Sequence, residues 1–271
     1  SSRDKLHWRT EDDPVTSLLR DGILVTDGEA HDAMRSSMNA PMHKQSLTNY
    51  VETMQSCTDA IIDEWSSERP IDMLVEMRKI ALMILTETLF KVDIAPDMDR
   101  MWQPILKTIQ YISPGLWILW KQVPRPGYAS KINTMNEYLY QIIEARRASI
   151  NEAEATDLLG ILIVSGLNND LIRDQLLTML IAGHDTSTAL LAWALYLLTT
   201  HPEIMKHVKQ EVDSVLGTAP PTIENISGLS YLGQVIDETL RMYPPIHLGS
   251  RYVTEDIEFD GFLIPAGIRV M

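Results

Sequence analysis

The spacing of hydrophobic residues predicts helices along most of the chain. Apolar side chains recur at intervals of three and four residues in segments 45–67, 71–90, 101–111 and 132–150, the period of one helix face. Shorter helices are predicted from Glu29 and over residues 157–164. The pattern therefore favours a mainly helical protein.

One predicted helix is unusually long. Residues 170–200 contain no helix breaker except Gly183, so that this helix would extend over roughly 45 Å. Two further helices follow, over residues 202–217 and 230–243, before Pro244-Pro245 stops the pattern.

The last part of the chain has a different pattern. Segments 251–253, 257–259, 262–264 and 268–270 alternate as short strands, separated by Asp260-Gly261 and by Pro265-Ala266-Gly267. The predicted fold class is therefore mainly α with a small β region near the C-terminus, organised as a single domain.

Composition narrows the class of protein. The chain has 271 residues, 45% of them hydrophobic, which is enough to bury a sizeable core. Its net charge is −14, which argues against nucleic-acid binding because phosphate contacts need a basic face. Cys57 is the single cysteine, so an internal disulfide is excluded. We expect it to be a buried packing residue of the helix predicted over residues 45–67.

Apolar runs are too short to predict a membrane span. None reaches the roughly 18 residues that a transmembrane helix needs, and the first residues lack signal-peptide character. We expect a cytoplasmic protein, and the sequence leaves open a membrane anchor upstream of residue 1.

The first chemical motif is Ala-Gly-His-Asp-Thr-Ser at residues 182–187, in the long helix. Thr186 follows Ala182 by four residues, so its hydroxyl can reach that carbonyl. We predict a local opening of the helix there, whose freed backbone groups could hold water or a ligand. An acid beside a hydroxyl can pass protons, and small side chains at 182 and 183 allow a flat ligand close to the backbone. The alternative is a buried helix that tolerates a glycine.

Two further pairs of charged residues share helix faces. Glu238 and Arg241 are three residues apart, among the apolar Val235, Ile236 and Leu240, which predicts a largely buried ion pair that needs further hydrogen bonds. The alternative is a solvated surface pair.

His31 and Arg35 follow the Asp27-Gly28 turn and are four residues apart, so they also share a face. Such a pair is otherwise commonplace on helix surfaces.

These segments, in this order, resemble the cytochromes P-450, a family of haem-thiolate monooxygenases. Residues 182–187 resemble the family's central-helix motif, and Glu-Thr-Leu-Arg-Met-Tyr-Pro-Pro at 238–245 resembles its K-helix motif. Residues 27–35 resemble the segment Asp-Gly-x-x-His/Trp-x-x-x-Arg, and residues 261–267 resemble the hairpin that ends Ile-Pro-x-Gly. The resemblance covers essentially the whole chain and implies a cytochrome P-450 fold that is incomplete at both ends, without the N-terminal strands and the haem-cysteine loop.

The resemblance implies a role for particular residues. Asp185 and Thr186 would be catalytic, delivering protons during activation of dioxygen. Haem contacts would come from His31, Arg35, Ala182, Gly183, Thr186 and Arg251, with the two arginines and the histidine at the propionates. Glu238 and Arg241 would be structural. A substrate pocket is predicted at Leu177, Leu180, Ile181, Ile246 and Leu248.

The implied activity is insertion of one oxygen atom of O2 into an apolar organic substrate, with electrons from a separate ferredoxin or reductase. The family's axial cysteine lies downstream of the Ile-Pro-x-Gly hairpin, and Cys57 does not match its loop, so we expect the cysteine beyond Met271. If the protein ended at residue 271, the alternative is a haem-free helical scaffold or binding protein of the same fold. No metalloprotease, nucleophile-elbow or phosphate-loop motif competes.

Overall fold

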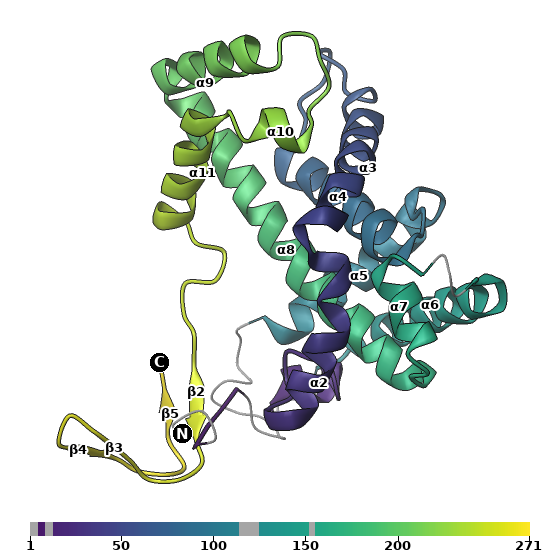
Figure 1. Ribbon diagram of the computed structural model, residues 1–271, viewed down its shortest axis with the longest axis vertical. Helices are drawn as coiled ribbons and strands as arrows, with labels where there is room; N and C mark the ends of the chain where they lie inside the picture. Colours follow the sequence, from purple (N-terminus) through teal and green to yellow (C-terminus); the bar gives the residue numbers. More distant parts are fainter. Residues whose placement is uncertain (1–4, 9–12, 114–124, 152–154) are drawn as a thin grey trace. The chain divides into compact units, whose positions relative to one another are not determined.

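The computed structural model describes residues 5–8, 13–113, 125–151 and 155–271 (Figure 1). The chain forms two compact units, each assembled from separate stretches of sequence. The first comprises Ser1–Ala40, Ala95–Ile181 and Leu248–Met271, and the second comprises Pro41–Ile94 and Ala182–His247.

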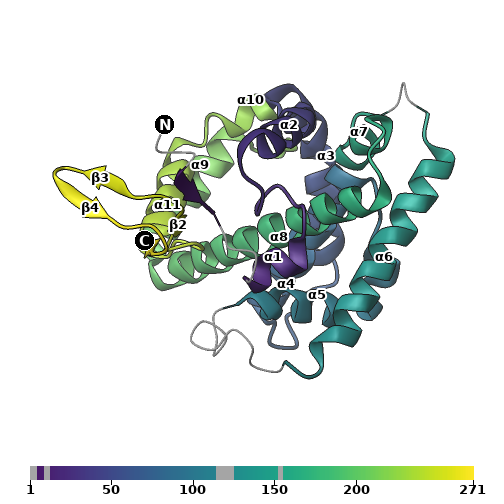
Figure 2. The ribbon, with the colours of Figure 1, turned by 90° about the horizontal axis from the view of Figure 1, so that it is seen from below.

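The first unit has a helical core. Its helices are α1 (Pro14–Leu19), α2 (Gly28–Met38), α5 (Met98–Ile112), α6 (Tyr128–Ser149), α7 (Leu158–Val164) and the first part of α8 (Asn169–Thr200), with the short 3-10 turn η4 (Ala95–Asp97) before α5. α5 packs along α6 (Figure 2). The fully buried side chains of Met101, Ile105, Met135, Leu139 and Ile143 fill this interface, which confirms the two apolar faces predicted for these helices.

Residues 172–181 of α8 are almost all buried, and two of them, Arg173 and Asp174, are charged. Arg173 is only 1% exposed. Its guanidinium donates to the carbonyl oxygen of Leu18 at 2.9 Å, to Oδ1 of Asp174 at 2.8 Å, and to Oδ1 of Asn136. Asp174 in turn accepts from the backbone N–H of Asp21 at 3.2 Å. Buried charges persist when they are paired and hydrogen-bonded in this way, so this cluster ties the loop after α1 to α8.

The second unit is also helical. It contains the 3-10 turn η2 (Ala40–Met42), α3 (Lys44–Ile62), α4 (Met73–Leu85), the π-helical turn η3 (Thr86–Phe90), the remainder of α8, α9 (Pro202–Val215), α10 (Ile223–Ile226) and α11 (Ser230–Met242). Asp72 caps α4 by accepting from the N–H groups of Leu74 and Val75. A buried cluster of Ile61, Met77 and Ile80 joins α3 to α4, and α8 packs against it through Ala192 and Leu195.

Short strands complete the first unit. β1 (Leu6–His7), β2 (Arg251–Val253) and β5 (Arg269–Val270) form an antiparallel sheet in the order β1-β2-β5. β3 (Ile257–Phe259) and β4 (Phe262–Ile264) form a hairpin with Phe259 opposite Phe262. Asp260 and Gly261 both have positive φ, 50° and 78°, as a two-residue hairpin turn requires. The four C-terminal strands were predicted, whereas no sequence pattern predicts β1.

In the part of the chain that the structure describes, no helix is both long and apolar enough to cross a membrane. The same residues contain no group of histidine, cysteine and acidic side chains that could hold a metal ion.

Candidate active site on the central helix

The motif at residues 182–187 lies within unbroken α-helix. Thr186 Oγ1 donates to the carbonyl oxygen of Ala182 at 2.7 Å, which confirms the predicted back-bond. The predicted opening of the helix is wrong, because α8 continues as regular α-helix through all six residues. A threonine hydroxyl can add a hydrogen bond to a carbonyl that keeps its place in the helix, since a carbonyl oxygen has two acceptor sites.

One face of this segment is uncovered, and the opposite face is buried. Successive residues of a helix are rotated by about 100°, so Ala182 and Thr186 share a face and His184 points the other way. Ala182 is exposed, Thr186 is half-buried, and His184 is only 1% exposed. The exposed side of the segment bears only small side chains, namely Ala182, Thr186 and the neighbouring exposed Ser187, which gives a flat ligand room to lie against the helix.

Gly183 lies on a flank where α8 approaches α4. A Cβ atom added at Gly183 would lie 2.8 Å from Cδ1 of Leu85, closer than carbon atoms normally pack. The glycine therefore has a packing reason, which is the close approach of Leu85. Its predicted contact with a cofactor stays a separate prediction.

We predict that Gly183→Ala destabilises the protein by about 1 kcal/mol, because crowding in a packed core, typically about 1–3 kcal/mol, outweighs the better helix propensity of alanine. In a Leu85→Ala background the same substitution should become stabilising, by up to about 1 kcal/mol. Thermal unfolding of the four proteins in this double-mutant cycle measures both effects.

Gly233 supplies the control for this cycle. It lies inside α11, and a Cβ there would have no atom within 4 Å, so Gly233→Ala should stabilise in either background. Equal effects of Gly183→Ala with and without Leu85 would contradict the packing explanation.

Asp185 lies between the exposed face and the buried face. Its Oδ1 is 3.7 Å from Nη2 of Arg78 on α4. The preceding residue makes a second contact with the same partner, because Nε2 of His184 is 3.2 Å from the carbonyl oxygen of Arg78. A carbonyl only accepts hydrogen bonds, so Nε2 must carry the proton.

The His184 imidazole is held neutral. Burial is the largest cause and lowers the pKa of this histidine below its ordinary 6.5, the charge of Arg78 lowers it further, and Asp185 acts in the opposite direction. Nδ1 is buried without a hydrogen-bond partner in the described part of the chain, as suits a neutral ring with a single N–H.

The neutral histidine predicts a pH-dependent stability. The pKa of His184 is lower in the folded state than in the unfolded state. Below about pH 6.5 the unfolded state therefore binds more protons at this residue, and the wild type should lose stability as the pH falls. His184→Gln keeps a side-chain N–H for the carbonyl of Arg78 and cannot titrate. We expect its unfolding free energy to fall less between pH 7 and pH 5, with a difference of at most about 1.4 kcal/mol per pH unit. Urea unfolding at three pH values measures this, and parallel curves for the two proteins would contradict it.

The three predicted cationic residues lie in the first unit. His31 is on α2 with Nδ1 3.0 Å from Asp32 Oδ1. Arg35 follows one turn later, is exposed, and has no carboxylate partner among the described residues. Arg251, at the start of β2, stacks its guanidinium over the Trp8 ring at 4.0 Å. Arg251 Nη1 also donates to the carbonyl oxygen of Ser250 at 2.9 Å. Neither arginine has a carboxylate partner in the described residues, so each guanidinium still has donors for an anionic ligand.

The predicted K-helix pair forms, but it is not buried. Arg241 Nε and Nη2 each lie 2.7 Å from a carboxylate oxygen of Glu238, and this hydrogen bond lowers the pKa of Glu238. The two side chains are 70% and 55% exposed. The expectation of a buried pair is therefore wrong for this chain, because the apolar neighbours that favoured burial are not buried themselves. Leu240 is 37% exposed, and Val235 lines the same pocket as Glu238.

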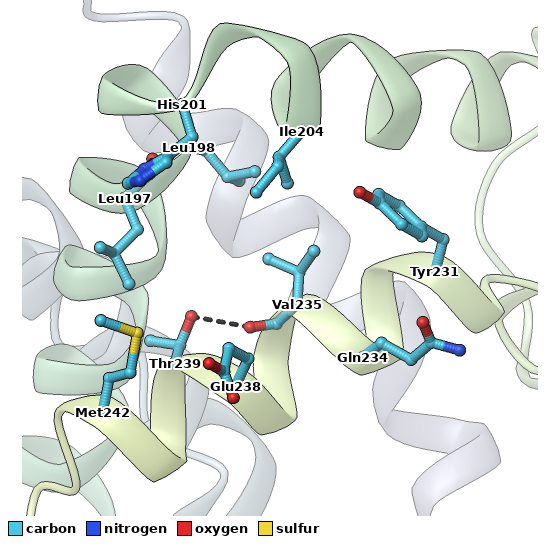
Figure 3. Close-up of a pocket in the computed structure, with 10 residues that line it drawn as sticks. All are labelled: Leu197, Leu198, His201, Ile204, Tyr231, Gln234, Val235, Glu238, Thr239 and Met242. Atoms are coloured by element: carbon cyan, nitrogen blue, oxygen red, sulfur yellow. Dashed lines mark hydrogen bonds between the residues drawn. The ribbon is translucent and has the colours of Figure 1, made fainter.

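A pocket of about 350 Å³ lies beside this pair, where α8, α9 and α11 meet (Figure 3). Leu198, Ile204 and Val235 point toward one another at its centre (Figure 3). The remaining lining residues are Leu197, His201, Tyr231, Gln234, Glu238, Thr239 and Met242. Leu197 is eleven residues beyond Thr186, about 16 Å along the helix, so this pocket is separate from the exposed face at residues 182–187.

The residues predicted to line a substrate pocket divide into two groups. Leu177, Leu180 and Ile181 are 0%, 1% and 6% exposed, so in this chain they are core residues of the first unit. Ile246 and Leu248 are 70% and 58% exposed, and their contact with a substrate stays a prediction. Cys57 is buried and unpaired, which confirms its packing role, and burial raises the pKa of its thiol.

Sequence reasoning missed Arg78, Leu85 and Trp8. Arg78 and Leu85 lie on α4, about a hundred residues before the motif that they contact. No local pattern marks them, because helical spacing predicts which face is apolar and not which helix packs against it.

Comparison with known proteins agrees with the motifs. The cytochrome P-450 family profile matches residues 9–271. Cytochrome P-450 139 of Mycobacterium bovis is 31% identical over 256 residues, which are 90% of this chain and 59% of that protein. The cyclooctat-9-en-7-ol 5-monooxygenase of Streptomyces melanosporofaciens is 28% identical over 96% of this chain and 59% of its own length.

The fold has a close counterpart among solved structures. The retinoic acid-bound cyanobacterial CYP120A1 superposes with a TM-score of 0.86 and 22% sequence identity, over 99% of this chain and 62% of that chain. The present chain thus spans about three fifths of the relatives it matches. Because the family profile extends over nearly all of its residues, the chain belongs to the cytochrome P-450 family.

Proposed function

We propose that the full-length protein containing this chain is a haem-dependent monooxygenase that hydroxylates an apolar organic molecule. In this reaction a C–H bond, O2, two electrons and two protons give an alcohol and water. The observation that carries the proposal is the uncovered face of α8, where Thr186 is hydrogen-bonded to Ala182 and directly follows the acidic Asp185. Both units would belong to one catalytic domain.

Taken unit by unit, the described residues have the chemistry that haem binding needs. The exposed face at Ala182 leaves space for a planar macrocycle, and Gly183 adds no side chain beside it. Arg35 and Arg251 are exposed arginines without carboxylate partners in the described residues, and guanidinium groups bind carboxylates such as the propionates by paired hydrogen bonds. His31 would add a third donor. When bound, haem would supply the activation of dioxygen.

Thr186 and Asp185 would share the handling of protons. The Thr186 proton is held by the Ala182 carbonyl, and a hydroxyl also has two acceptor sites. Thr186 can therefore accept a hydrogen bond from water or ligand on the exposed face, orienting it there. Asp185, one residue earlier and 46% exposed, can carry protons between solvent and this position.

Glu238 and Arg241 would be structural, since each satisfies the other on the surface of α11. The substrate would be apolar, and Ile246 and Leu248 are the exposed residues proposed to contact it. Electrons would come from a separate ferredoxin or reductase. The relative from Streptomyces is named for oxidation of cyclooctat-9-en-7-ol, a mainly hydrocarbon molecule, which supports this substrate class.

A spectrum of the full-length gene product tests the proposal. The protein is reduced and carbon monoxide is added, and we expect the absorption band that is typical of thiolate-ligated haem. Absence of the band in correctly folded protein would overturn the proposal and support the haem-free scaffold. A second quantity, the peroxide yield, reports on proton delivery: hydrogen peroxide released per pair of electrons consumed, with a surrogate ferredoxin and ferredoxin reductase.

A further inference from the structure

Asp185 has two sides toward which its carboxylate can turn. At about 100° per residue, residue 185 lies between the direction of Thr186 and the direction of His184. The Thr186 side is the exposed face of α8, and the His184 side is buried. A group fixed on the buried side can therefore set the position of the carboxylate.

Arg78 occupies that side. Its guanidinium Nη2 is 3.7 Å from Asp185 Oδ1. The Nε of the same group is buried and has no hydrogen-bond partner among the described residues. Asp185 is thus the anion that this guanidinium meets in the described part of the chain, and the contact is a charge interaction longer than a hydrogen bond.

The position of Arg78 is itself fixed by the packing of α4 on α8. Its backbone carbonyl accepts from the buried His184, and its neighbour Met77 and, on the same helix, Ile80 lie in the core cluster that Ala192 and Leu195 cover. Seven residues later Leu85 lies against Gly183. The backbone from which the Arg78 side chain extends is therefore held in place on α8.

We propose that Arg78 is a positioning residue for proton delivery: its guanidinium holds the Asp185 carboxylate at the edge of the exposed face of α8. This role rests on the proposed function. Arg78 contacts neither the exposed face nor Thr186, so it acts through Asp185. His184, the residue before Asp185, donates to the backbone carbonyl of Arg78 and so helps to fix the part of α4 from which the arginine extends.

We expect the ion pair between Arg78 and Asp185 to contribute little to stability. Partly exposed pairs contribute little to folding because water and salt screen them, and the Arg78 and Asp185 side chains are 25% and 46% exposed. The consequence of losing Arg78 should consequently appear in proton delivery rather than in unfolding. This separates a positioning role from a structural one.

The test compares Arg78→Gln, Arg78→Lys and Lys79→Gln in the full-length protein. Lys79 is the matched control, because it is the next residue of α4 and pairs with Glu76 at 3.0 Å instead of with Asp185. We expect the peroxide yield of Arg78→Gln to rise roughly two- to fivefold, the size suited to loss of a partly exposed ion pair. Arg78→Lys should recover most of the wild-type value, and Lys79→Gln should match the wild type.

A second measurement needs no haem chemistry. The imidazole of His184, assigned with His184→Gln, is titrated by NMR. Because Arg78 lowers the pKa of His184 and Asp185 raises it, Arg78→Gln should raise that pKa and Asp185→Asn should lower it. Lys79→Gln should leave it unchanged.

The outcomes are distinct. A wild type without the carbon monoxide band overturns the proposed function and this role with it. A normal band with an unchanged peroxide yield in Arg78→Gln overturns only the role of Arg78. That role is also overturned if Arg78→Gln lowers the unfolding midpoint and Arg78→Lys fails to restore the yield, since arginine would then be needed for structure.

Discussion

Replacing Arg173 by methionine is expected to lower the unfolding free energy by about 3–5 kcal/mol, the usual result when one partner of a buried ion pair is removed. Methionine fills a similar volume but offers no donor. The carbonyl of Leu18, the amide oxygen of Asn136 and the carboxylate of Asp174 would each lose a hydrogen bond. Asp174 is 2% exposed, so it cannot turn to water instead.

The loss of unfolding free energy in Arg173→Met, called its deficit below, should depend on pH. Burial raises the pKa of Asp174, whereas Arg173 acts to lower it. Without the arginine the pKa of the folded state rises further above that of the unfolded state. A carboxyl shifted in this direction stabilises the fold when protonated, and that stability is lost as the pH rises through the folded pKa. Urea unfolding should therefore show a smaller deficit at pH 5 than at pH 8.

Two controls accompany this measurement. Arg241→Gln removes an exposed ion pair, with side chains 70% and 55% exposed, and should leave the unfolding free energy nearly unchanged. The double variant Arg173→Met with Asp174→Asn removes both buried charges, and it should be more stable than Arg173→Met alone. A deficit in Arg173→Met no larger than that of Arg241→Gln would contradict the assigned role of the buried cluster.

The buried cluster marks a limit of sequence reasoning. Helical spacing predicted the long helix within one residue of its observed start, because residues 170–200 contain a single weak breaker. The same spacing cannot show that Arg173 and Asp174 are buried, since charged residues are usually placed at the surface. Their partners Leu18, Asp21 and Asn136 lie 37 to 155 residues away in sequence.

The candidate site was predictable where the chemistry is local. Thr186 bonds to Ala182 four residues earlier, and Glu238 pairs with Arg241 three residues later, because these spacings are properties of a helix. The side chains that depend on a second helix were not predictable. Leu85 explains Gly183, and Arg78 faces Asp185, and both contacts are set by how α4 packs on α8.

The second large effect is expected at Thr186. We predict that Thr186→Ala lowers product formation about tenfold or more, because a positioned group in proton transfer typically contributes at least that much. Electron consumption should continue, and the peroxide yield should approach one hydrogen peroxide per electron pair. Without the hydroxyl, the exposed face of α8 would lose the group that we propose to orient a proton donor there.

The stability of this variant separates chemistry from folding. Alanine has the higher helix propensity, and a threonine bonded to the carbonyl four residues earlier slightly weakens a helix. The unfolding midpoint should therefore stay close to that of the wild type, and the carbon monoxide band should be retained. Thr186→Ser keeps the hydroxyl and should keep most of the coupling between electrons and product.

Thr188 provides the matched control. Its hydroxyl donates to the carbonyl oxygen of His184 at 2.8 Å, the same back-bond that Thr186 makes, and it lies on the same helix. Thr188 is only 1% exposed, so it does not reach the uncovered face. Thr188→Val loses the same kind of hydrogen bond and should leave the peroxide yield unchanged. If both variants raised the yield equally, the effect would come from the helix backbone, and the hydroxyl of Thr186 would have no special part in proton transfer.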